Sequence, residues 1–131
     1  MPTILLINDD IPLRTALKRA LRFAGFEVLE AGHGREGLIH LAAHPVHLVL
    51  TDILMPEMEG VETILHLRRQ RPDLRIIAMS GGSRFDAGVC LQLAKSSGAD
   101  TTLAKPFSTS DMLEAVAAML PEPVTSPAER L

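Results

Sequence analysis

The sequence has little cysteine, few aromatic side chains and no long apolar run, and each shortage excludes a class of protein. Among its 131 residues Cys90 is the one cysteine, which excludes an intramolecular disulfide and suits a reducing compartment. Aromatic residues make up 3% and are all phenylalanine, which disfavours a stacking platform for a flavin or single-stranded nucleic acid. The apolar runs are too short to cross a bilayer, and the first residues, MPT, lack the regions of a signal peptide. We therefore expect a cytoplasmic protein with no membrane partner.

An excess of positive charge is also missing. With 13 Lys and Arg against 16 Asp and Glu, the formal net charge is −3, so we do not expect a DNA-binding protein. Hydrophobic residues make up 47% and charged residues 22%, which is typical of a globular domain and not of a disordered chain. The length predicts one domain with a single core.

Short apolar runs alternate with segments of helical period. The expected strands are Thr3–Ile7, Phe26–Ala31, Val46–Thr51, Arg75–Met79 and Thr101–Ala104, and the expected helices cover residues 11–24, 35–43, 60–71, 86–97 and 109–120. Strict alternation predicts an α/β fold, a doubly wound five-stranded parallel sheet with helices on both faces. The last eleven residues, 121–131, contain three prolines, so we expect one domain over residues 1–120 and a disordered tail.

The helix termini carry their own signals. Asp10 is expected to cap the first helix, and Gly25 is expected to end it. Ser108 and Asp111 have the spacing of a capping box, which predicts the start of the last helix.

Two other groups of side chains are interpreted as surface features. The basic run at residues 68–71 is typical of a solvated helix end favoured by the helix dipole. His40, His44 and His47 could suggest a metal site, but Pro45 breaks the helix between them. We interpret these histidines as surface residues.

Polar side chains follow four of the expected strands. They are Asn8, Asp9 and Asp10 after the first strand, Asp52 after the third, Ser80 after the fourth and Lys105 after the fifth. In a doubly wound sheet, ligands bind beyond the carboxyl ends of the strands, where these side chains converge. Neighbouring carboxylates need a cation, and oxygen ligands favour Mg²⁺ or Mn²⁺ over zinc. With Lys105 opposite, this set suits phosphoryl transfer to Asp52.

Four segments, ILLINDD, LVLTDILMPEMEG, IIAMSGG and GADTTLAKPF, stand in order, each at a strand end. Together they resemble a two-component response-regulator receiver domain of the single-domain, chemotaxis-regulator type, over about residues 3–120. The resemblance implies the flavodoxin-like (βα)5 receiver fold. It also implies that Asp52 is the phosphoacceptor.

The resemblance implies further roles around Asp52. Mg²⁺ would be bound by Asp9, Asp52 and the backbone carbonyl of Leu54, with Asn8 in the outer sphere acting through a water molecule. Three further residues would contact the phosphoryl group: Ser80, Gly81 and Lys105. The switch positions would be Ser80 and Thr102. The Lys105–Pro106 peptide bond is expected to be cis.

The sequence departs from the family pattern in several places. Asn8 stands where the first acid of a pair is expected, and Asp9 with Asp10 is an alternative pair. Asn8 with Asp9 is preferred because residues 13–14 then keep their usual distance from the pair. Thr102 replaces the aromatic switch residue, Gly81 replaces an alanine, and the stretch 82–97 is longer than typical. Asn8 predicts weaker Mg²⁺ binding, and the other departures predict an altered output switch.

The leading hypothesis is a receiver that takes a phosphoryl group from a sensor histidine kinase and signals by protein contact. A histidine phosphotransfer protein is a possible further partner, and we do not expect the chain to be an enzyme. The alternative is a pseudo-receiver, which binds a partner without being phosphorylated. A flavodoxin would need a loop rich in Ser, Thr and Gly where this chain has NDDIP, and a dehalogenase-type phosphatase would need a second acid at Pro12.

Overall fold

The structure, a computed structural model, describes residues 2–53, 59–80, 96 and 98–120. The strands are β1 (Thr3–Ile7), β2 (Glu27–Ala31), β3 (Leu48–Asp52), β4 (Arg75–Ser80) and β5 (Thr101–Ala104). The helices are α1 (Ile11–Phe23), α2 (Gly34–Ala43), α3 (Glu59–Gln70) and α5 (Thr109–Met119). The helix expected over residues 86–97 and the expected tail fall outside the described residues, apart from Ser96.

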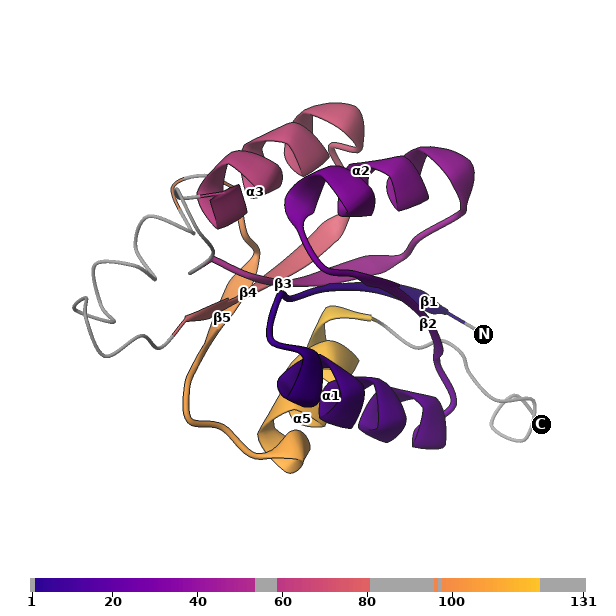
Figure 1. Cartoon of the computed structure of the whole chain (residues 1–131), viewed down its shortest axis with the longest axis vertical. Coiled ribbons are helices and arrows are strands. Elements are labelled where there is room, and N and C mark those ends of the chain that lie inside the picture. The colour runs from indigo at the N-terminus through magenta and orange to yellow at the C-terminus, as the bar shows by residue number, and fades with distance from the viewer. Residues whose placement is uncertain (1, 54–58, 81–95, 97, 121–131) are drawn as a thin grey trace.

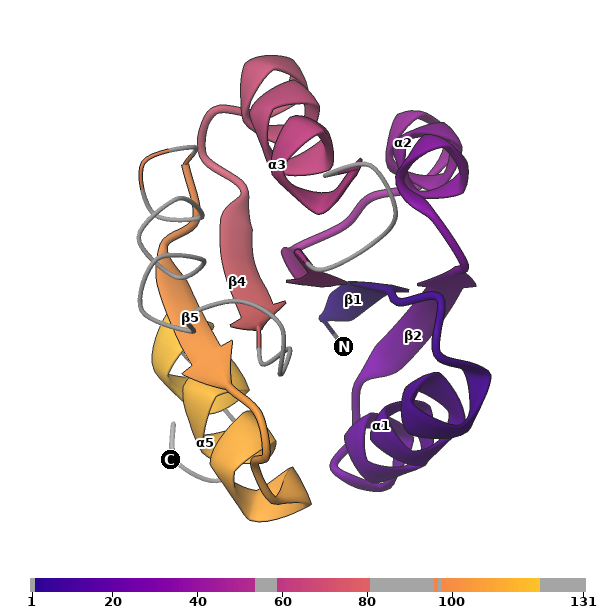
Figure 2. The same cartoon turned by 60° about the vertical axis from the view of Figure 1, so that its left-hand side comes forward.

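The strands form one five-stranded sheet in the order β2-β1-β3-β4-β5, and every neighbouring pair is parallel. Figure 2 shows this sheet between its helices. The order reverses between β1 and β3, as in flavodoxin-like folds. The expected doubly wound parallel sheet is therefore confirmed, and the carboxyl ends of β1 and β3 lie next to each other.

Helices α2 and α3 cover one face of the sheet, and α1 and α5 cover the other (Figure 1). Successive side chains of β1 alternate between these two layers. Leu5 and Ile7 belong to the core under α2 and α3, whereas Ile4 and Leu6 belong to the core under α1 and α5. The strand is buried on both faces, which explains its continuous apolar run.

The predicted helix termini are confirmed. The Asp10 carboxylate accepts a hydrogen bond from the Leu13 N–H at 3.1 Å, and Gly25 follows α1 with φ of 102°. Ser108 and Asp111 form the expected capping box at the start of α5. Short polar motifs predicted these ends because their partners lie within a few residues.

Three strands have bounds that differ from the expectation, and β4 is one of them because it ends at Ser80, one residue late. β2 begins at Glu27, one residue late, and β3 runs from Leu48 to Asp52. The Val46 carbonyl is outside the ladder because it accepts a hydrogen bond from Arg71 at 2.9 Å. At its other end, β3 extends one residue further than expected, so Asp52 is its last residue.

The prediction of a solvated basic helix end is wrong for Arg68 and Arg71. Arg68 lies at the centre of a cluster that we call the Arg68 clamp, which consists of Arg68, Pro72, Leu74, Gly98 and Asp100. Its guanidinium donates to the carbonyls of Pro72 at 2.7 Å, Leu74 at 2.6 Å and Gly98 at 2.6 Å, and to the Asp100 carboxylate at 2.9 Å. The clamp joins the end of α3 to the start of β4 and the approach to β5.

No helix in the described ranges is both long and apolar enough to cross a membrane.

Candidate functional site

Asp52 and Lys105 form an ion pair at the carboxyl edge of the sheet. The Lys105 Nζ lies 3.0 Å from the Asp52 Oδ2. The Asp52 side chain is 4% exposed, and that of Lys105 is 26% exposed. Asp52 ends β3, and Lys105 directly follows β5, so the sheet brings together two residues far apart in sequence. A partly buried pair of this kind is screened much less than a surface pair.

Asn8 lies beside Asp52 on the neighbouring strand. Ile7 pairs with Thr51 in the β1–β3 ladder, so the next residues along are Asn8 and Asp52. Side chains at the same register of adjacent parallel strands point to the same side of the sheet. Alternation from Leu6 and Leu50, which both pack under α1 and α5, places Asn8 and Asp52 on that side.

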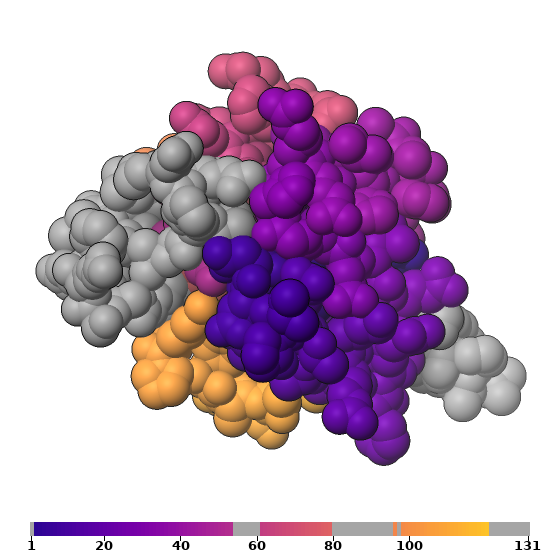
Figure 3. Space-filling view, viewed as in Figure 1, coloured from indigo at the N-terminus to yellow at the C-terminus, as the bar shows by residue number. Residues whose placement is uncertain are grey.

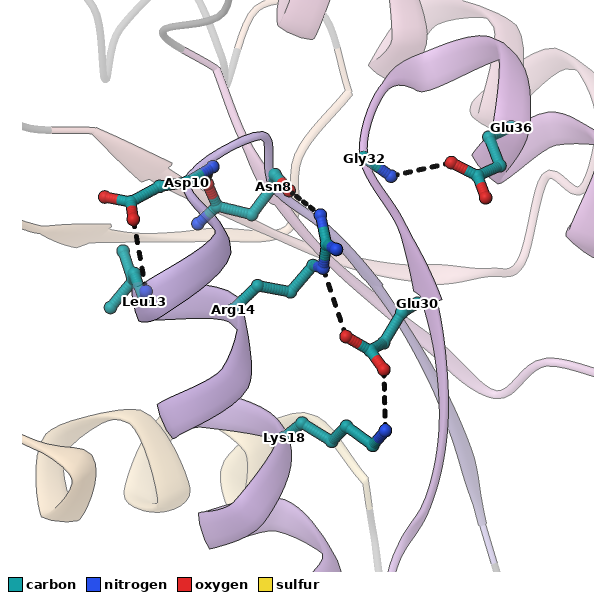
Figure 4. Close-up of polar contacts among 8 residues, drawn as sticks. All are labelled: Asn8, Asp10, Leu13, Arg14, Lys18, Glu30, Gly32 and Glu36. Atoms are coloured by element: carbon teal, nitrogen blue, oxygen red, sulfur yellow. Dashed lines mark hydrogen bonds and ion pairs between the residues drawn. The ribbon is translucent and has the colours of Figure 1, made fainter.

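The amide of Asn8 has a defined orientation. Asn8 is fully buried, and its Oδ1 accepts a hydrogen bond from the Asp10 N–H at 2.9 Å. Its backbone carbonyl accepts a hydrogen bond from the Arg14 Nη1 at 2.7 Å. Figure 4 shows the amide turned away from Arg14. The Asn8 Nδ2 is buried and has no hydrogen-bond partner among the described residues.

Asp9 and Asp10 differ in what they contact. Both are exposed, and Asp10 uses its carboxylate to cap α1. The cap and the Asn8 contact give Asp10 a structural role, which favours Asn8 with Asp9 as the working pair. That pairing stays a prediction.

Sequence reasoning missed a network of charges next to Asn8, in which two cations of α1 meet an acid of β2. The Arg14 Nε lies 3.1 Å from one Glu30 oxygen, and the Lys18 Nζ lies 2.7 Å from the other (Figure 4). The hydrogen bond from Lys18 is the main cause that lowers the pKa of Glu30, with Arg14 adding to it against partial burial. The four-residue spacing of the two cations, facing an acid in the next strand, was the available signal.

The remaining predicted site residues are distributed as follows. Ser80 is the last residue of β4, so its backbone lies at the same edge of the sheet as Asp52. Thr102 is half-buried in β5 and pairs with Ala78. The Lys105–Pro106 peptide bond is cis, as expected. Leu54 and Gly81 lie outside the described residues.

The donor set fits a hard divalent cation. Mg²⁺ usually takes one or two carboxylates and keeps several waters, and Asp9 and Asp52 can supply those carboxylates. Among the described residues there is no group of three His, Cys, Asp or Glu side chains that could hold a metal. His47 accepts a hydrogen bond from the Thr3 N–H at 3.0 Å, so it has a structural contact. Because the proposed ligands are oxygen atoms, they favour a hydrated Mg²⁺ over zinc.

Comparison with known sequences identifies relatives over most of the chain. The sequence profile of the response regulator receiver domain matches residues 4–117. The transcriptional regulatory protein CpxR of Klebsiella pneumoniae is 36% identical over 120 residues, which is 92% of this chain and 50% of CpxR. The DNA-binding transcriptional regulator NtrC of Rhizobium meliloti is 31% identical over 127 residues, 97% of this chain and 26% of NtrC. The chain thus spans half or less of the length of these relatives.

Solved structures share the fold. A CheY-like receiver domain protein from Methanospirillum hungatei has a TM-score of 0.82 at 30% identity, covering 90% of this chain and 92% of that one. Chemotaxis protein CheY4 of Vibrio cholerae has a TM-score of 0.83 at 28% identity, covering 92% and 99%. Response regulator TrrA of Thermotoga maritima, solved in complex with Mg²⁺-BeF, has a TM-score of 0.77 at 28% identity, covering 92% and 100%. With its profile match, its relatives and its fold in agreement, the chain belongs to the response-regulator receiver domains, the signalling domains of two-component systems.

Proposed function

We propose that this receiver domain accepts a phosphoryl group on Asp52 from a sensor histidine kinase. The observation that carries the proposal is the ion pair between Asp52 and Lys105 at 3.0 Å, at the edge of the sheet where ligands bind. Asp52 is almost completely buried, so its carboxylate is held in one place by the end of β3. A fixed carboxylate beside a fixed cation suits attack on a phosphoryl group.

The proposed step is a simple phosphoryl exchange. A carboxylate oxygen of Asp52 forms a bond to phosphorus while the P–N bond of the donor phosphohistidine breaks. The electron pair of that bond stays on the histidine ring, which takes up a proton from water. Lys105 then contacts a phosphoryl oxygen in place of the Asp52 oxygen, so its positive charge offsets charge that moves with the group. Bound Mg²⁺ supplies further positive charge to the phosphoryl oxygens.

Other residues at the edge have positioning roles in this proposal. Asp9, Asp52 and the Leu54 carbonyl would hold Mg²⁺, and the Asn8 Oδ1 would accept a hydrogen bond from a water molecule bound to it. Ser80, Gly81 and Lys105 contact the phosphoryl group, with Ser80 and Thr102 as switch positions. The oxygen of Asn8 already accepts one hydrogen bond from Asp10, and an amide oxygen has room for a second.

We further propose that the phosphorylated domain signals by contact with another protein, or passes the group to a histidine phosphotransfer protein. The mildly acidic charge, −3, supports protein contact over DNA binding by this chain. In this proposal the chain acts in the cytoplasm, contacts no membrane and has no enzymatic activity of its own.

Mass spectrometry tests the phosphorylation directly. The chain is incubated with acetyl phosphate and Mg²⁺, and its intact mass is measured. We expect the addition of one phosphoryl group to the wild type and none to Asp52→Asn. Asp73→Asn is the matched control, because Asp73 is an exposed turn residue away from the edge. Labelling that persists in Asp52→Asn contradicts the assignment of Asp52.

A pseudo-receiver is the second candidate, and Asn8 is the observation that favours it. With Asn8 in place of an acid, the edge has less negative charge with which to bind Mg²⁺. A wild-type chain that gains no mass from acetyl phosphate or from phosphorylated kinase at high Mg²⁺ supports this second candidate.

A further inference from the structure

We infer that Asn8 is a direct ligand of the phosphoryl group, donating a hydrogen bond from its Nδ2 to an oxygen of the group carried by Asp52. The inference rests on the proposed phosphorylation of Asp52 and adds a residue to the set that binds the group. It concerns the donor half of the amide, whereas the outer-sphere role expected for Asn8 concerns its oxygen.

The first step is the orientation of the amide. The Asn8 Oδ1 accepts the Asp10 N–H at 2.9 Å, which assigns the oxygen and nitrogen positions within the side chain. The Asn8 carbonyl accepts from Arg14 at 2.7 Å, and the Asn8 N–H donates to the Ala31 carbonyl at 3.0 Å. The backbone N–H, the backbone carbonyl and the amide oxygen of Asn8 are therefore all hydrogen-bonded, which fixes the orientation of its NH₂ group.

The second step is the missing partner. The Asn8 side chain is fully buried, and its Nδ2 makes no hydrogen bond with the described residues. Buried polar groups are nearly always paired, and a buried donor without an acceptor is costly. Such a donor at the edge of a ligand site indicates an acceptor that arrives with the ligand.

The third step is the chemistry of that acceptor. The register places Asn8 beside Asp52, on the same side of the sheet. The two N–H groups carry partial positive charge, so they attract an anionic oxygen and repel a metal cation. Lys105 already reaches the Asp52 carboxylate at 3.0 Å. Asn8 and Lys105 would thus donate to phosphoryl oxygens from β1 and from the end of β5.

This role predicts that the affinity for Mg²⁺ and the affinity for a phosphoryl analogue change in opposite directions, whereas an argument from charge alone predicts that they change together. An acid at residue 8 would attract Mg²⁺ more strongly, but it would repel the phosphoryl group and offer it no hydrogen. Asn8→Asp is therefore expected to tighten Mg²⁺ binding and to weaken binding of a phosphoryl analogue at saturating Mg²⁺. A tighter binding of Mg²⁺ together with a weaker binding of the analogue, in the same variant, is the result that distinguishes this inference.

The composition makes a direct observation possible. Asn8 is the one asparagine in the sequence, so selective ¹⁵N-asparagine labelling gives a single side-chain NH₂ signal. We expect this signal to move downfield and its exchange with water to slow when beryllium fluoride is added to the Mg²⁺-saturated wild type. Mg²⁺ alone should produce a smaller change.

Titration of beryllium fluoride at saturating Mg²⁺ gives the affinities. We expect Asn8→Ala and Asn8→Asp to weaken the binding of beryllium fluoride about tenfold or more, as for the loss of a hydrogen bond to a charged group. Gln70→Ala is the control, because it removes an exposed amide and should change neither affinity.

The outcomes are distinguishable. If the wild type binds beryllium fluoride while the Asn8 signal stays in place and Asn8→Ala keeps its affinity, the inference is wrong and the proposed function stands. If the wild type takes up neither beryllium fluoride nor a phosphoryl group, both are wrong. The labelled wild-type measurement decides the matter even where a variant fails to fold.

Discussion

At the scale of single residues, Glu30 connects the helix next to the site with an edge strand. Its carboxylate accepts hydrogen bonds from Lys18 at 2.7 Å and Arg14 at 3.1 Å, and Arg14 also holds the Asn8 carbonyl. These bonds lower the pKa of Glu30 from its usual 4.5, with the bond from Lys18 as the largest cause. Because the folded-state pKa is the lower one, the stabilisation is complete above the usual pKa. It is lost as the pH falls through the folded pKa.

Glu30→Gln should therefore lower the free energy of unfolding at pH 7 by about 0.5–1 kcal/mol, as for partly exposed ion pairs. The difference in unfolding free energy between this variant and the wild type should shrink below pH 4.5. It should vanish at lower pH, where the wild-type carboxylate is protonated and residue 30 is neutral in both proteins. Urea unfolding at several pH values measures this. Glu27→Gln, an exposed acid of the same strand, should show little change at any pH. A difference for Glu30→Gln that stays constant into strong acid would contradict the prediction.

Asp9 and Asp10 offer a second test at this scale. Asp10→Ala removes the cap of α1 and should cost about 1 kcal/mol of stability without weakening Mg²⁺ binding. Asp9→Ala removes a carboxylate proposed to bind the metal, so it should nearly abolish Mg²⁺ binding and leave stability almost unchanged. Mg²⁺ titration in low salt, together with urea unfolding, measures both properties. Weaker Mg²⁺ binding by Asp10→Ala would indicate that Asp9 and Asp10 are the working pair.

At the scale of elements, the Arg68 clamp fixes where α3 ends and where β4 starts. Four acceptors surround the Arg68 guanidinium. One of them is the carbonyl of Leu74, a residue that is 2% exposed. Asp100 bonds the Arg68 side chain and also the Ile76 N–H at 2.8 Å. A planar group with five donors can satisfy this arrangement, whereas an ammonium cannot reach all of its acceptors.

Arg68→Lys is accordingly expected to lower the free energy of unfolding by about 1–3 kcal/mol, because it leaves acceptors at the joint unpaired while keeping the charge. Arg69→Lys is the matched control, since Arg69 is the exposed neighbour and should change stability by less than about 0.5 kcal/mol. Chemical denaturation of the two variants provides the comparison. Equal midpoints for both would show that the clamp contributes nothing.

At the scale of the whole molecule, we expect the output of the domain to depend on how the proposed site is coupled to the side formed by β5 and α5. Thr102, which we propose as a switch position, is half-buried in β5 and has no ring that could move between buried and exposed places. We expect beryllium fluoride to change backbone amide shifts strongly around Asp52 and weakly along β5 and α5. Thr102→Tyr should enlarge the changes on that side. Large changes there in the wild type, measured by NMR, would contradict this expectation.

Sequence reasoning succeeded where partners are close along the chain. The β-branched run at residues 3–7, the cap at Asp10 and the end at Gly25 follow from local preferences, and the structure confirms them. It missed the Arg68 clamp because Asp100 lies 32 residues away. It placed Asn8 at the site but gave no orientation for its amide, because that depends on the folded turn to Asp10. Contacts made by folding, rather than residue types, account for what was missed.

The Arg68 clamp also anchors β4 and β5 to each other, through Asp100. Asp100, which directly precedes β5, is joined to Ile76 of β4 by two hydrogen bonds of 2.8 Å. Ser80 and Lys105 stand at the opposite ends. The two strands are also paired from Ile77 and Thr101 to Ser80 and Ala104, so they form one hydrogen-bonded unit that is anchored at the end far from Lys105. A displacement of Lys105 would therefore have to move β4 and β5 together against this anchor, which agrees with the weak changes expected along β5 and α5.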